Sequence, residues 1–130
     1  MTAKVAKGTV FEDGGATFLA RVRGNSGAAI TQASLSTITC KVFDLDVAPD
    51  TSILAPSVVI ASTVFDTMQG ASFSDARWTA DATGYNFLHE MPATAFPDGQ
   101  RRYRVEYKFT PVSGAVFWLV FEVLALEIRS

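Results

Sequence analysis

Residues 101–126 read RRYRVEYKFTPVSGAVFWLVFEVLAL, and this stretch decides the fold. Residues 102–109 alternate between polar and apolar side chains, which is typical of a strand with one buried face and one solvated face. Turn-forming proline, serine and glycine follow within residues 111–114. The alternation then stops, because residues 116–121 are all apolar. We therefore expect a hairpin whose second strand has two apolar faces, of which the outer one needs a cover.

The composition predicts a single well-packed domain spanning residues 1–130. The chain is 48% hydrophobic and only 18% charged, and this content is enough to bury a real core at this length. A formal net charge of -2 supplies no general attraction for nucleic acid or anionic lipid. The sequence shows no signal-peptide pattern and no apolar run near the ~20 residues that a membrane span requires. We expect a protein made in the cytoplasm that binds neither nucleic acid nor a membrane.

Short strand patterns separated by turn signals recur along the chain. Besides the hairpin, we expect strands over residues 4–11, 16–23, 37–45, 57–65 and 85–91, and weaker ones over 28–35 and after Trp78. Residues 46–56 contain two prolines and are expected to form a long loop. No segment keeps a helical apolar period over three turns. About eight strands at this spacing predict an all-β fold with little helix, namely a single antiparallel β-sandwich.

Two details refine this prediction. In PDGQRRYRVEY, the turn residue Asp98 precedes Tyr103 and a Tyr-x-Val-x-Tyr strand. This resembles the penultimate strand of immunoglobulin-like and fibronectin type III-like sandwiches, in which such a tyrosine packs at a corner. The Cys–Trp–Cys arrangement of antibody domains is absent. Residues 1–8 are either ordered with the sandwich or form a flexible arm that a partner orders.

Few residues suit catalysis. His89 is the only histidine, and alternation places it on the face of Tyr85 and Phe87, so we expect a partly buried side chain rather than a general base. Cys40, the only cysteine, alternates with Ile38 and is expected to be a buried apolar residue. No serine-nucleophile elbow is present. We therefore expect a protein that is not an enzyme, with a small hydrolase as the least favoured alternative.

Metal and cofactor sites have little support either. Asp44, Asp46 and Asp50 are the only local group of carboxylates that calcium could use. Their spacing lacks the glycine and the distal glutamate of an EF-hand loop, so we expect a solvated strand end, with calcium as the weaker alternative. The glycine pair in residues 24–27 lies between strand patterns and lacks the context of a phosphate-binding loop. No cofactor is expected.

The second strand of the hairpin is then the best candidate for function. If Phe117, Leu119, Phe121 and Val123 point inward, every second residue points outward, and monomers rarely leave such a patch exposed. Either the 46–56 loop or another chain must cover it. A basic row on the preceding strand is either an ordinary charged outer face or a contact for an acidic surface. The candidate interface residues are Val116, Trp118, Val120, Ile53, Leu54, Arg102, Arg104 and Lys108, and Arg101 adjoins this row.

Three stretches extend this hypothesis: FLARVRGNSGAAITQASLSTITCKVFDLD, GYNFLHEMP and RRYRVEY. Together they resemble small β-sandwich proteins encoded among the structural genes of tailed bacteriophages. The resemblance implies a virion component, either a capsid cement (decoration) protein or a tail or baseplate accessory. It also implies a homo-oligomer whose partners are the major capsid protein or other virion subunits. A carbohydrate-binding module that stacks sugars on Trp78, Tyr85 and Trp118 is an alternative from another class.

Overall fold

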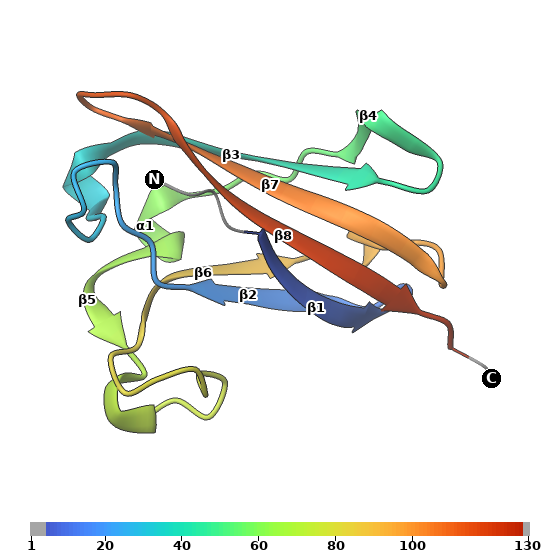
Figure 1. Cartoon of the computed structure of the whole chain (residues 1–130), viewed down its shortest axis with the longest axis horizontal. Coiled ribbons are helices and arrows are strands. Elements are labelled where there is room, and N and C mark those ends of the chain that lie inside the picture. Colours follow the sequence, from blue (N-terminus) through green and yellow to red (C-terminus); the bar gives the residue numbers. More distant parts are fainter. Residues whose placement is uncertain (1–4, 129–130) are drawn as a thin grey trace.

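Two β-sheets pack against each other in the computed structural model of the chain, which describes residues 5–128 (Figure 1). The five-stranded sheet has, in spatial order, β1 (Val5–Phe11), β8 (Phe117–Leu126), β7 (Arg101–Pro111), β3 (Leu35–Asp44) and β4 (Ala48–Leu54). The three-stranded sheet has β2 (Ala16–Ala20), β6 (Tyr85–Met91) and β5 (Val64–Gln69). Strand β1 pairs with β8 in parallel, and every other pairing in the described part of the chain is antiparallel.

This strand order is the one used by immunoglobulin-type sandwiches. In that notation β2, β6 and β5 take the places of strands B, E and D, while β4, β3, β7 and β8 take those of C′, C, F and G. The chain crosses to the other sheet after β1 and returns before β3. Such crossings between sheets are the Greek-key connections typical of β-sandwiches. The prediction of an all-β, immunoglobulin-like sandwich of about eight strands is therefore confirmed.

The alternating half of the hairpin forms the centre of the core. Tyr103, Val105, Tyr107 and Phe109 on β7 are fully buried, as the alternation predicts. Phe87 on β6 contacts this row from the opposite sheet, and its ring centroid lies 4.8 Å from that of Tyr107 in an edge-to-face arrangement. Edge-to-face aromatic pairs add to the burial of apolar surface, so this contact helps to hold the two sheets together.

The predicted tyrosine corner is present before β7. The Tyr103 hydroxyl accepts a hydrogen bond from the Asp98 backbone N–H at 3.0 Å and donates to the Asp98 carbonyl at 3.2 Å. The ring packs against Phe96, with centroids 5.4 Å apart. Two partly buried hydrogen bonds of one hydroxyl therefore anchor the loop between β6 and β7 to the start of β7.

Replacing Tyr103 with phenylalanine should lower the free energy of unfolding by about 1–2 kcal/mol, because both Asp98 backbone groups lose their protein partner while the ring packing remains. The loss is limited because the site is only partly buried, so water can replace the hydroxyl. Urea denaturation of both proteins measures the difference. An unchanged midpoint with an unchanged slope would show that the corner contributes nothing to stability.

Several sequence predictions in the first half of the chain are wrong. Residues 28–35 do not form a strand of their own: Ala29 makes only an isolated bridge with Arg23, a short 3₁₀ helix (Gln32–Ser34) follows, and β3 begins at Leu35. Thr31 caps this helix by accepting a hydrogen bond from the Ser34 backbone N–H at 3.3 Å. The segment 46–56 is not all loop, because β4 forms on the edge of β3. Two register shifts in that pairing accommodate a strand containing Pro49.

The middle of the chain and its beginning also differ from the predictions. Residues 57–65 were predicted as a strand from their β-branched side chains, but α1 (Ile60–Thr63) lies in that segment and β5 starts only at Val64. Trp78 does not lead a strand. Residues 5–8 of the predicted arm belong to β1, and residues 1–4 lie outside the described residues.

Candidate interaction surface

The outward side of β8 is apolar along most of its length. Trp118 is 55% exposed, and Phe11 on the neighbouring β1 is 56% exposed. The pairing of β1 with β8 places Phe11 opposite Leu126, so both side chains lie on the same outer face of the five-stranded sheet. We call the exposed apolar residues along β1 and β8 the apolar stripe. Its members are Val5, Phe11, Val116, Trp118, Leu124 and Leu126.

The chain segment proposed as an internal cover does not reach this stripe. Ile53 and Leu54 lie on β4, at the opposite edge of the sheet, and β7 and β3 separate them from β8. Leu54 packs against the core instead, while Ile53 is exposed. The hypothesis that this segment covers the outer face of β8 is therefore wrong, and these two residues do not adjoin the other interface candidates.

Val120 also differs from its prediction. It has the parity of the outward row, but it is only 8% exposed. Its cross-strand neighbours are Val5 on β1 and Glu106 on β7, so it is flanked on both sides within the sheet. Val120 therefore lies in the outward row but adds almost no exposed surface to the stripe.

The basic row on β7 is largely compensated by nearby carboxylates. Arg104 Nε lies 2.7 Å from Glu106 Oε2, and Arg102 Nη1 lies 4.0 Å from Glu122 Oε1. Lys108 lies over the Trp118 ring, with its ammonium 5.7 Å from the ring centroid. Since exposed ion pairs contribute little and leave little unbalanced charge, the apolar stripe rather than this row dominates the chemistry of the face.

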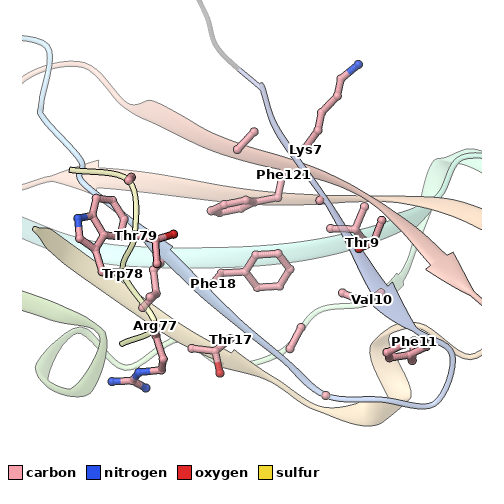
Figure 2. Close-up of a pocket in the computed structure, with 17 residues that line it drawn as sticks. Lys7, Thr9, Val10, Phe11, Thr17, Phe18, Arg77, Trp78, Thr79 and Phe121 are labelled. Atoms are coloured by element: carbon pink, nitrogen blue, oxygen red, sulfur yellow. The ribbon is translucent and has the colours of Figure 1, made fainter. Parts of the chain in front are cut away.

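A groove opens on the other side of β1. Because β1 and β2 are edge strands of different sheets, the sandwich is open between them, and the groove there has a volume of about 620 Å³. Phe18 and Phe121 lie at its floor, with ring centroids 4.6 Å apart (Figure 2). Ala6 and Gly8 point into this opening and remain exposed. Strand β1 is therefore accessible from both of its faces.

Ion pairs hold the loop that borders this groove. Asp81 lies 2.7 Å from Arg21, and this guanidinium lowers the pKa of the Asp81 carboxyl to about 2. Hydrogen bonds from Arg77 and Tyr85 hold the pKa of Asp75 well below its usual range. Trp78 donates its indole N–H to the Asp81 carbonyl at 3.0 Å. These contacts position the loop, so its charged groups already have partners.

The three aromatic residues proposed as sugar platforms do not form one surface. Trp78 and Tyr85 are neighbours, with ring centroids 5.7 Å apart, but Tyr85 is buried. Trp118 lies on the outer face of the five-stranded sheet, whereas Tyr85 belongs to β6 of the other sheet. A single sugar chain stacked on all three is incompatible with this arrangement.

His89 and Cys40 are both buried in the core, as predicted. His89 Nδ1 lies 2.7 Å from the Tyr107 hydroxyl and Nε2 lies 3.3 Å from the Ser57 carbonyl, so each ring nitrogen faces a protein group. Burial lowers the pKa of His89, which keeps the ring neutral. Burial raises the pKa of the Cys40 thiol to about 12, which removes the thiolate that a reactive cysteine needs.

The only histidine should make stability depend on pH between 7 and 5. The pKa of His89 in the folded protein lies below its ordinary value near 6.5, so the unfolded chain takes up a proton first as the pH falls. The free energy of unfolding should therefore fall below pH 6.5, by at most about 1.4 kcal/mol per pH unit. Urea denaturation at several pH values measures this slope. In His89→Gln the slope should vanish, since Asp75 and Asp81 stay ionised in this range; a persisting slope would contradict the assignment.

Of the three aspartates considered for calcium, two are bound to protein groups and the third lies on β4. Asp44 is buried rather than solvated, and its carboxylate lies 3.0 Å from Arg101. Asp46 accepts a hydrogen bond from the Arg102 backbone N–H at 2.8 Å, while Asp50 is exposed on β4. Within residues 5–128, no three acidic, histidine or cysteine side chains gather as a metal site. Asp44 does stabilise the turn at the end of β3, as predicted, because its Oδ1 accepts a hydrogen bond from the Asp46 backbone N–H at 3.1 Å.

Sequence reasoning missed four of the six residues of the apolar stripe and all of the groove. The parity that places Trp118 outward also places Leu124 and Leu126 outward, so these two residues could have been found. The alternation along β1 could likewise have placed Val5 and Phe11 on one face. It could not have shown that β1 pairs with β8. The groove depends on which strands form the sheet edges, and no local pattern carries that information.

Comparison with known proteins adds no further constraint. No protein-family model, curated protein or solved structure matches the chain. In the described part of the chain, no helix combines the length and the apolar character that crossing a membrane requires.

Proposed function

We propose that this protein is a non-enzymatic structural protein of a phage-type virion, and specifically a capsid cement protein that bridges neighbouring subunits. The observation that carries the proposal is the apolar stripe on the outer face of β1 and β8, in which Trp118 is more than half exposed near the start of β8. The partner is the major capsid protein or another virion subunit. The protein would then be located in the virion after synthesis in the host cytoplasm.

The chemistry of the stripe favours binding to another protein. Exposed apolar side chains gathered on one face mark interaction sites, and here the Lys7–Glu122 pair lies between the two groups of apolar residues. Tryptophan is among the residues most enriched at the energetic centre of interfaces. The neighbouring ion pairs of Arg104 and Arg102 supply a polar rim beside the apolar centre. A stripe on the outer face of a sheet can lie across a joint between two subunits.

One further observation supports a binding role without a chemical step. The only histidine and the only cysteine are buried, both ring nitrogens of His89 face protein groups, and the raised pKa of Cys40 disfavours its thiolate. The resemblance of residues 18–46, 84–92 and 101–107 to structural proteins of tailed phages, an expectation from the sequence alone, is the reason for proposing the virion as the place of action. A cement protein stabilises the assembled particle by mass action, because it binds the assembled joint and not the separated subunits.

Capsids assembled from the major capsid protein encoded in the same genome test the proposal. Purified protein added in excess should co-sediment with them and raise the temperature at which they come apart, with a shift that grows with protein concentration. If the protein neither co-sediments with these capsids nor changes that temperature, the cement function is wrong. Co-sedimentation with tails alone would assign the protein to the tail or baseplate instead.

A further inference from the structure

The free edge of β1 is the least protected strand edge of the sandwich. Among the four edge strands of the described sheets, β4 carries Pro49, Asp50 and two register shifts, and β5 pairs irregularly with β6. Strand β2 has only five residues. By contrast, β1 pairs with β8 without a break over its whole length, contains no proline, and carries Lys7 as its single charge. Proteins usually block such edges, since unpaired backbone groups accept another strand.

The residues of β1 are complementary to a second, antiparallel copy of themselves. A two-fold axis at Gly8 would place Val5 opposite Phe11 of the second copy and Ala6 opposite Val10. Lys7 would lie opposite Thr9 of the second copy, so no charges of the same sign meet. Moving the axis to Lys7 brings two lysines together, and moving it to Thr9 leaves Val5 without a partner. Only the register centred on Gly8 pairs all residues of β1 and keeps apolar side chains opposite one another.

We propose that two copies of this chain form a symmetric dimer through antiparallel pairing of their β1 strands, centred on Gly8. One sheet then runs through both molecules, and the outer faces of both copies lie on the same side of it. Phe11 and Leu126 of one copy come next to Val5 of the other, so the two apolar stripes merge into one surface. Pairing also covers the exposed Ala6 and Gly8, which line the groove. This dimer does not depend on the capsid being the partner.

The charge pattern of the register provides the first test. Sedimentation equilibrium of the wild-type protein should give twice the chain mass of 14.0 kDa. Thr9→Lys creates two lysine–lysine pairs across the two-fold axis and should weaken the dimer at least about tenfold. Thr9→Glu creates two lysine–glutamate pairs and should tighten it at low salt. Thr17→Lys, the same change at an exposed position on β2, is the matched control and should leave the dimer unchanged.

A cross-link tests the register itself. In Gly8→Cys the two cysteines face each other across the axis, and nothing lies within 4 Å of the Cβ that the substitution adds. Directly opposed Cα atoms in an antiparallel pair are about 4.5–5.5 Å apart, within the range that a disulfide spans. Mild oxidation should give a covalent dimer on a non-reducing gel. Thr17→Cys should stay a monomer on the same gel, and the buried Cys40 is not expected to react.

The possible outcomes separate this proposal from the cement function. A wild-type protein that remains monomeric up to the highest concentration tested overturns the dimer, even if it stabilises capsids. A dimer whose dissociation constant is unchanged by Thr9→Lys and that Gly8→Cys does not cross-link also overturns it. A dimer with both expected responses supports it, even if the protein binds no capsid. Circular dichroism of each variant confirms that the sandwich is folded before the mass is interpreted.

Discussion

Replacing Trp118 with glutamate is expected to weaken binding to the capsid by at least about 30-fold, which corresponds to about 2 kcal/mol. The substitution removes the largest exposed side chain of the apolar stripe and adds a charge that the interface would have to desolvate. The fold should hardly change, since the tryptophan is 55% exposed and its main described contact is Lys108. Binding is measured by co-sedimentation with capsids over a range of protein concentrations.

Phe73→Glu is the matched control for this substitution. Phe73 is also aromatic and 55% exposed, but it lies in the connection between β5 and β6 of the other sheet. Binding by this variant should equal that of the wild type. If Trp118→Glu binds as tightly as the wild type, or if both variants lose binding equally, the apolar stripe is not the interface.

Replacing Phe87 with alanine should lower the free energy of unfolding by about 3–5 kcal/mol. Phe87 is fully buried on the middle strand of the three-stranded sheet. Its ring contacts Tyr107 and Phe109 on β7, with centroid distances of 4.8 Å and 5.7 Å. The truncation leaves a cavity between the two sheets, and a domain of this size has only about 5–15 kcal/mol of stability to lose. Urea denaturation at pH 7.5 gives the value.

Phe73→Ala provides the comparison, because it removes the same atoms from an exposed position. Its effect on the free energy of unfolding should be within about 0.5 kcal/mol. A loss below 1 kcal/mol for Phe87→Ala would contradict the packing of β6 against β7. An equally large loss for Phe73→Ala would contradict the exposed position of that residue.

The strands could be predicted where side-chain alternation is governed by the core. Residues 85–91 were predicted with the observed bounds, and the Tyr103 row faces inward as expected. The tyrosine corner was also found, because its signal is local: a turn residue shortly before a tyrosine. Alternation likewise gave the outward orientation of Trp118. In each case, one residue pattern was sufficient because one physical requirement, burial of alternate side chains, acts along the strand.

The errors arose where tertiary contacts decide between local alternatives. The β-branched residues before Val64 favour a strand, yet Ile60–Thr63 forms a helical turn. The segment with Pro49 resembles a loop, but it pairs with β3 at the sheet edge, where a missing N–H is tolerated. The burial of Val120 depends on the parallel pairing of β1 with β8, which brings the two ends of the chain together. Contacts this far apart in sequence leave no local pattern.

The most direct test of the proposed function is a cryo-electron microscopy map of capsids saturated with the protein. We predict density for the sandwich at the joints between capsid subunits, with the outer face of β1 and β8 turned toward the shell and Trp118 in contact with it. Capsids incubated with Trp118→Glu at the same concentration should show this density much reduced or absent. A map without added density would contradict the proposed function, as would density that contacts the shell only through β2, β6 and β5.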